Sequence, residues 1–190
     1  MKINFLDFFR KNNDLQDIYS ASGFEVLAKS VNTYPFFLCL ESNNGYAYSS
    51  RFMVKPGDVG KVGNIIESFF RKKIENEKVC LINNEKIVHY YKFNEFSQIV
   101  LDIITNDNDN DNDNDLIRKL CNEHFEPPAP DTVFPYSDFE SVGSLQGQID
   151  LWWNVYWSPF WISLSEEDKV KYLERNNISG ELREFLILHS

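Results

Sequence analysis

The most constraining feature of the sequence is a tryptophan-rich segment in its last quarter. All four tryptophans of the 190 residues lie within residues 152–161. Read as a helix over residues 148–157, this segment carries apolar side chains on nearly every side, and after Gln148 only Asp150 and Asn154 interrupt them. Such a helix must be covered almost all round, either by its own domain or by another molecule.

The size of the tryptophan side chain indicates whether the chain's own domain or another molecule covers this helix. Each tryptophan buries about 150 to 250 Å², so four of them represent roughly 15 to 25 kcal/mol of gross burial free energy. Leaving them all in water would forfeit more than the usual net stability of about 5 to 15 kcal/mol. We therefore expect most of them in the core of the monomer, with one or two at a rim, where tryptophan is a preferred contact residue. Trp153 is the candidate for that exposed position.

Composition limits the partners that the chain can bind. There are 29 acidic side chains against 19 Lys and Arg, a formal net charge of −10. This balance argues against nucleic-acid phosphates and anionic membranes, and it suits a basic protein partner. The three cysteines, Cys39, Cys80 and Cys121, are widely spaced, and the first two stand in apolar, strand-like runs typical of buried reduced thiols. Because no signal-peptide core or long apolar run accompanies them, we expect a cytoplasmic protein.

Residues 1–105 have the pattern of an α+β body. Helical spacing over the first thirty residues is followed by apolar strand-like runs, by the hairpin signal Asn44-Gly45, and by a helical pattern from Asp58 to about Glu75. A second hairpin is predicted over residues 79–93, and a helix from Asn94 to about Thr105. The predicted fold is a largely antiparallel four-stranded sheet, built from two hairpins, with helices packed on it.

Residues 106–115 repeat Asn-Asp five times. Both residues are poor in helix and strand, and the like charges repel, so we predict a disordered, solvated loop. Alternating aspartates also open the calcium loop of EF-hand proteins. The tract has no glycine at the sixth position and no glutamate at the twelfth, so we expect no calcium site and no other metal.

Residues 116–190 are predicted to be mainly helical, and with the preceding body they complete a single domain, 1–190. A short helix over residues 116–124 leads to a proline-rich loop, 125–145, that interleaves aromatic and acidic side chains. Aromatic residues among acids suit a basic protein surface, or they attach the loop to its own domain. Beyond it we expect helices that start at Ser158-Pro159, Ser165 and Ser179.

No set of residues carries a catalytic signature. The glycine-rich stretch 55–63 lacks the spacing and the Ser or Thr of a phosphate loop. Cys121 and His124 stand one helical turn apart, and Asp150 is the carboxylate that we identify within an apolar run. These three residues define the alternative of a small intracellular enzyme. His89 is interpreted as a strand residue with its hydrogen bonds satisfied. We predict no catalytic residues and no cofactor.

The segment from Trp152 to Leu188, particularly Leu164-Ser-Glu-Glu-Asp-Lys-Val-Lys-Tyr-Leu173, resembles bacterial immunity proteins of contact-dependent and polymorphic toxin systems. The resemblance extends to type: a small acidic α+β chain with a tryptophan-rich helical end. It implies a stoichiometric inhibitor that binds a cognate toxin without a cofactor. Many such toxins are nucleases with basic clefts, which an acidic face would complement.

These considerations predict a toxin-binding face at the junction of the proline-rich loop and the tryptophan segment. Its candidate residues are Asp131, Tyr136, Asp138, Glu140, Asp150, Trp153 and Asn154. The expected inhibitor is a monomer or a weak homodimer. Besides the enzyme, a second alternative stays open: a regulatory or structural subunit whose aromatic patch completes a homodimer.

Overall fold

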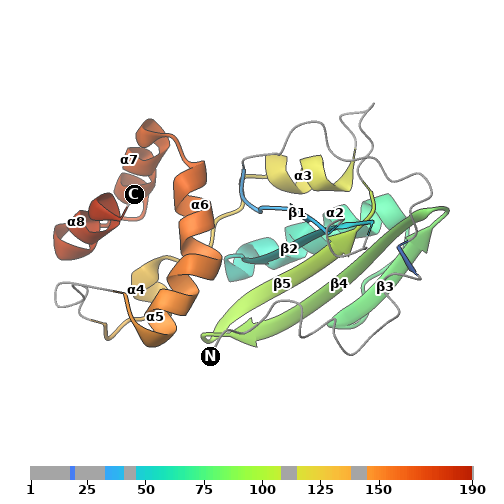
Figure 1. Ribbon diagram of the computed structural model, residues 1–190, viewed down its shortest axis with the longest axis horizontal. Coiled ribbons are helices and arrows are strands. Elements are labelled where there is room, and N and C mark those ends of the chain that lie inside the picture. The colour runs from blue at the N-terminus through green and yellow to red at the C-terminus, as the bar shows by residue number, and fades with distance from the viewer. Residues whose placement is uncertain (1–17, 20–32, 41–45, 108–114, 138–144, 190) are drawn as a thin grey trace.

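The architecture is an open antiparallel sheet with helix α2 along one face and a group of helices at one end (Figure 1). The computed structural model describes residues 18–19, 33–40, 46–107, 115–137 and 145–189. Five strands lie in these ranges: β1 (Leu38–Cys39), β2 (Tyr48–Met53), β3 (Lys78–Asn83), β4 (Lys86–Glu95) and β5 (Gln98–Thr105). They are ordered β1-β2-β5-β4-β3, and each neighbouring pair is antiparallel. The α+β class and the antiparallel sheet are thus confirmed.

The number of strands differs from the prediction because the helix expected from Asn94 to Thr105 is wrong. That segment finishes β4, turns at Phe96 and Ser97, and returns as β5. Both turn residues have positive φ, 51° and 57°, although neither is a residue that signals such a turn. β5 is the central strand and is buried on both faces, so its apolar side chains, which only Asp102 interrupts between Ile99 and Ile104, do not alternate with polar ones. The second hairpin is therefore a three-stranded meander.

Helix α2 (Val59–Phe70) supplies part of the sheet's hydrophobic core. Its inward side chains, Val62, Ile66 and Phe70, belong to one buried cluster with β2 and β5. The helix begins after a short 3-10 turn, η3 (Pro56–Asp58), and ends where Arg71 takes a left-handed conformation, four residues before the predicted end. Helix α3 (Leu116–Asn122) follows the Asn-Asp tract and packs against α2.

The tryptophan segment forms one helical rod, α5 (Gly147–Trp152), the π-helical segment η4 (Trp153–Trp157) and α6 (Ser158–Ser163). Three tryptophan rings stack along it, with centroids 5.6 Å apart for Trp152 and Trp157 and 5.7 Å apart for Trp157 and Trp161. The rings join the main cluster of buried residues, as the burial argument predicts. The rod touches the sheet where the Trp152 Nε1 donates to the Met53 Sδ at 3.3 Å.

Helix α6 begins at Ser158, where a helix start was predicted, but Ser158 is not its N-cap, because Trp157 before it is already helical and the rod continues through Ser158-Pro159. A proline within a helix removes one hydrogen bond and its ring clashes with the carbonyl four residues earlier. Immediately before Pro159 the helix widens, and the Ser158 N–H donates to the Trp153 carbonyl five residues back. The π-helical turn thus accommodates the proline without ending the rod.

Two further helices pack beside the rod at the end of the chain, α7 (Glu166–Arg175) and α8 (Gly180–Leu188) (Figure 1). The predicted cap of α7 is confirmed, since the Ser165 side chain accepts a hydrogen bond from the Asp168 N–H. Helix α8 begins where predicted, but Ser179 makes no side-chain capping bond. The Trp161 Nε1 donates to the Leu186 carbonyl at 3.1 Å, which ties α8 to the rod. Among the described residues, none of the helices has the length and apolar character needed to cross a bilayer.

Candidate protein-binding site

A buried ion pair lies in the centre of the sheet. Asp102 on β5 stands opposite Arg51 on β2 and accepts two hydrogen bonds from its guanidinium, at 2.7 and 2.8 Å. The Asp102 side chain is 5% exposed, and the Arg51 guanidinium lies 5.3 Å from the centre of the Phe93 ring. Desolvation raises the pKa of Asp102 even against the favourable charge of Arg51. Because both members are satisfied within the sheet, the pair serves the fold.

Asp102 corrects the prediction that Asp150 is the one carboxylate in an apolar run. Asp102 follows Leu101 and precedes Ile103, so the same signal was present in the printed sequence. Asp150 is half-buried, at the edge of the tryptophan rod. Sequence neighbours are therefore a poor guide to which carboxylate loses its water.

A second buried contact joins the sheet to the tryptophan rod. The Tyr156 hydroxyl, in the π-helical segment, donates to Glu95 at the end of β4. Burial is the largest cause of a pKa for Tyr156 well above its usual value, and the neighbouring Glu95 adds to it. This contact fixes how the rod sits on the sheet.

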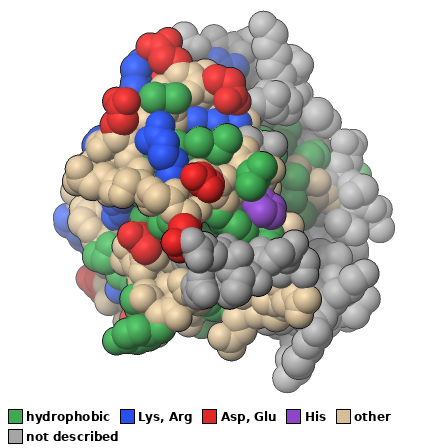
Figure 2. Space-filling view, turned by 90° about the vertical axis from the view of Figure 1, so that its left-hand side faces the viewer, with side chains coloured by type: hydrophobic (Ala, Val, Ile, Leu, Met, Phe, Trp, Pro, Cys, Tyr) green, Lys and Arg blue, Asp and Glu red, His purple; other side chains and the backbone are tan. Residues whose placement is uncertain are grey.

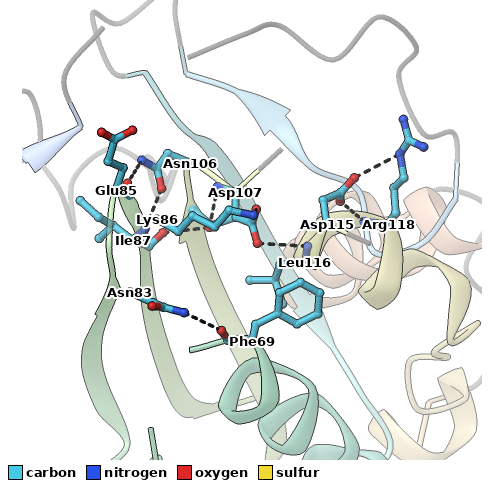
Figure 3. A network of polar contacts seen from close by, with 11 residues as sticks. Phe69, Asn83, Glu85, Lys86, Ile87, Asn106, Asp107, Asp115, Leu116 and Arg118 are labelled. Carbon is cyan, nitrogen blue, oxygen red and sulfur yellow. Dashed lines mark hydrogen bonds and ion pairs between the residues drawn. The ribbon is translucent and has the colours of Figure 1, made fainter. Parts of the chain in front are cut away.

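The two ends of the Asn-Asp tract meet just beyond the C-terminal end of β5 (Figure 3). Asp107 is ion-paired with Lys86 at 2.6 Å and accepts a hydrogen bond from the Leu116 N–H at 3.3 Å. Asp115 caps α3 by accepting from the Arg118 N–H at 2.6 Å, and the Arg118 Nε lies 3.1 Å from its other oxygen. Both carboxylates are buried and are neutralised by cationic side chains rather than open to a cation.

Asn106 completes this closure. Its side-chain oxygen accepts from the Ile87 N–H at 2.7 Å, and its amide donates to the Glu85 carbonyl at 2.8 Å. The prediction of a disordered, solvated loop is therefore wrong at residues 106, 107 and 115, because each continues the hydrogen bonding of β4 or α3. Residues 108–114 lie outside the described part of the chain. No group of three potential metal ligands occurs among the described residues.

The Cys121 thiol and the His124 imidazole, which suggested an enzyme, lie in different environments. The Cys121 thiol is buried and donates to the Pro35 carbonyl at 3.4 Å, and burial raises its pKa to about 11. His124 is exposed and has a left-handed φ of 52°. A thiol with this pKa is protonated at neutral pH and is a poor nucleophile. The expectation of buried thiols fails for Cys80, which is exposed, and for Cys39, which is half-buried.

His89 is a satisfied strand residue, as predicted. Its Nδ1 lies 2.7 Å from the Tyr19 hydroxyl, which donates its own proton to the Ile104 carbonyl at 3.0 Å. The imidazole Nδ1–H is therefore the donor to Tyr19. Burial lowers the pKa of His89.

Trp153 is not on an exposed rim, which corrects its place in the predicted face. The residue is 5% exposed, and its ring meets those of Phe185 and His189 at centroid distances of 5.3 and 5.7 Å. Helix α8 covers this side of the rod, and nothing in the local sequence distinguishes Trp153 from its buried neighbours. All four tryptophans are therefore buried in the core.

In its described part, residues 125–137, the proline-rich segment is attached to the fold by an aromatic side chain. It contains a short helix, α4 (Pro130–Val133), which the prediction of an unstructured loop missed. After it, Phe134 packs edge-on against Trp152 at 5.5 Å and against Phe96 at 5.9 Å. Two residues later, Tyr136 is 100% exposed. One aromatic residue thus attaches the segment to the rod, while the next faces solvent.

Three further described residues of the predicted face lie on two parts of the fold, Asp131 on α4, and Asp150 and Asn154 on the α5 and π-helical parts of the rod. Asp131 is exposed on α4, and Asn154 is exposed on the rod. The Asn154 amide donates to the Asp150 carbonyl at 2.9 Å and to the Asp150 carboxylate at 2.8 Å. Asp138 and Glu140 lie outside the described residues.

Charge on the helical side of the molecule is mixed rather than uniformly acidic. Residues 145–189 carry seven acidic and four basic side chains. Figure 2 shows acidic, basic and hydrophobic groups interspersed on this side. The face therefore offers specific contacts and only a mild negative field.

Comparison with known proteins found no match: no protein-family model, no curated protein and no solved structure is significantly similar to the chain.

Proposed function

We propose that the chain is an immunity-type inhibitor that binds a cognate bacterial toxin one to one in the cytoplasm and blocks it. The binding face that we assign comprises Asp131, Tyr136, Asp150 and Asn154. The observation that carries the proposal is Tyr136, a fully exposed aromatic side chain beside a firmly attached segment.

An exposed tyrosine on an ordered support has the properties of a binding hot spot. Tyrosine brings a large contact area at a low cost in conformational entropy, and its hydroxyl adds a polar contact. Phe134 anchors the backbone two residues earlier, and α4 precedes it. Because that support is already ordered, binding pays little for fixing it.

The acidic members of the face favour a basic partner. Asp131 is exposed, and Asp150 retains access to solvent. A toxin that acts on nucleic acid has a positive cleft, and such a cleft would be drawn to these carboxylates. The mixed charge in Figure 2 predicts that steering is modest and that close contacts supply most of the affinity.

The proposal predicts that a gene beside that of this chain encodes a toxin module, and the test uses that module. Purified chain and module should elute together as a one-to-one complex, measured by size exclusion with light scattering. The complex should have lost the module's activity, and co-expression of the chain should restore growth to cells that produce the module. Separate elution with the module's activity unchanged would refute the proposal. Elution of the chain as a stable dimer that does not bind the module would favour the regulatory-subunit alternative.

A further inference from the structure

The contact between Asn154 and Asp150 leaves an edge that can only accept hydrogen bonds. An asparagine amide has two N–H donors and one oxygen acceptor. Asn154 uses one donor on the Asp150 carbonyl and the other on its carboxylate oxygen Oδ1. The orientation of the amide is fixed by these partners, because a flipped amide would place its oxygen against two other oxygens.

Two oxygens remain on this edge, the Asn154 Oδ1 and the Asp150 Oδ2. No described residue donates to either, Asn154 is exposed, and Asp150 is partly exposed. The edge therefore presents two acceptors and one negative charge. A ligand that matches it must bring donors and a positive charge.

The backbone beneath this edge is held in place. The Asp150 carbonyl also accepts from the Trp153 N–H, at the junction where α5 passes into the π-helical segment. Three residues beyond the junction, Tyr156 is anchored to Glu95 of the sheet. The Asn154 amide thus satisfies a carbonyl at the point where the α-helical bonding pattern changes, and this role fixes its rotamer.

We infer that this edge binds the guanidinium group of an arginine on the partner. A guanidinium is a planar fork of N–H donors with no acceptor, so it can engage two neighbouring oxygens at once. A lysine ammonium is a point charge that lacks this fork. The inference rests on the proposed function, because it names the chemistry of the toxin residue that contacts the assigned face.

The first test does not require the toxin. Nitrogen-15-labelled chain is titrated with arginine methyl ester and, separately, with lysine methyl ester at equal ionic strength. The Asn154 side-chain amide and the Asp150 backbone signal should shift at least about twice as far with the arginine ester. The difference should vanish in Asp150→Asn, which keeps the shape but loses the charge. It should persist in Glu181→Gln, an exposed acid on α8 that serves as the matched control.

The second test uses the neighbouring toxin module and separates the two proposals. Asp150→Asn should weaken its binding about tenfold, whereas Glu181→Gln should leave it unchanged. If the module binds wild-type chain and Asp150→Asn equally, the arginine inference is wrong and the proposed function stands. If the module does not bind while the arginine ester still discriminates, the proposed function alone fails. Equal shifts with both esters at Asp150 and Asn154 would overturn the inference.

Discussion

Asp102 and Asp150 both stand among apolar neighbours in the sequence, yet the fold treats them in opposite ways. Asp102, in the centre of the sheet, is buried and accepts hydrogen bonds from Arg51 on both carboxylate oxygens. Asp150, at the edge of the tryptophan rod, gives one oxygen to Asn154 and keeps the other toward solvent. The first arrangement holds the structure together, and the second leaves bonding capacity for another molecule.

The difference follows from the geometry of the two elements. In a central strand both faces are covered, so any polar side chain must find its partner on a neighbouring strand. A helix packed on a sheet keeps one side toward water, and a polar residue there need not be fully satisfied. Whether an acidic side chain stabilises the fold or can bind a partner thus depends on whether its strand or helix face is covered. The apolar character of its sequence neighbours does not distinguish the two.

The largest expected effect comes from removing the buried acid. Asp102→Ala removes the carboxylate that neutralises the buried Arg51 guanidinium, which should lower the free energy of unfolding by about 3 to 5 kcal/mol. Asp150→Ala removes a partly exposed contact and should cost less than about 1 kcal/mol. Urea unfolding of both variants measures the difference. Similar losses of unfolding free energy in the two variants would show that Asp102 and Asp150 do not differ in their contribution to stability.

A smaller loss is expected where the rod meets the sheet. Tyr156→Phe removes the hydroxyl that donates a hydrogen bond to the Glu95 carboxylate. Because no other described residue donates to that carboxylate, the change should lower the unfolding free energy by about 1 to 2 kcal/mol. Tyr136→Phe, the same change at a fully exposed site, should alter stability by less than about 0.5 kcal/mol. If thermal or urea unfolding finds Tyr156→Phe as stable as wild type, the contact does not anchor the rod.

The pH dependence of stability should depend on His89. Its pKa is lowered in the folded state by burial, so the unfolded chain takes up the proton at a higher pH. Stability from this group is present above the unfolded value of about 6.5 and is lost as the pH falls through it. Wild type should therefore lose more unfolding free energy between pH 7.5 and pH 5.5 than His89→Asn. Parallel pH profiles would show that His89 does not contribute.

The mildest test changes no residue and compares rates of thiol modification. Cys80 is exposed, whereas Cys121 is buried with a pKa raised to about 11. At pH 8, iodoacetamide should modify Cys80 well before Cys121, and Cys121 should react only near its pKa or after unfolding. Peptide mass spectrometry follows each site. Rapid modification of Cys121 in the folded protein would revive the alternative of a catalytic thiol.

Part of the fold could be predicted because local signals and tertiary packing agree. The tryptophan core followed from the size of its side chains, and α7 followed from its Ser165 cap. β5 could not be recognised, because its turn uses Phe96 and Ser97 rather than Asn or Gly. A central strand covered on both faces also lacks the alternation that distinguishes a strand from a helix.

The candidate site was less accessible to sequence reasoning because contacts distant in the sequence decide it. Phe134 and Tyr136 are aromatic residues two positions apart, yet one packs on Trp152 and the other is fully exposed. Likewise, α8 decides that Trp153 is covered. The local sequence could nominate these residues for a face, but it contained nothing to assign each to the interior or to the surface.

The most direct test of the central claim is the affinity of the neighbouring toxin module for two variants, measured by titration calorimetry. Tyr136→Ala removes the exposed aromatic side chain of the assigned face, and Ile82→Ala removes an exposed apolar side chain on β3 of the sheet. Both should remain folded, because each side chain is solvent-exposed. We predict that Tyr136→Ala weakens binding at least about tenfold and that Ile82→Ala leaves it unchanged. Full affinity in Tyr136→Ala, or a loss confined to Ile82→Ala, would contradict the assignment of the binding face.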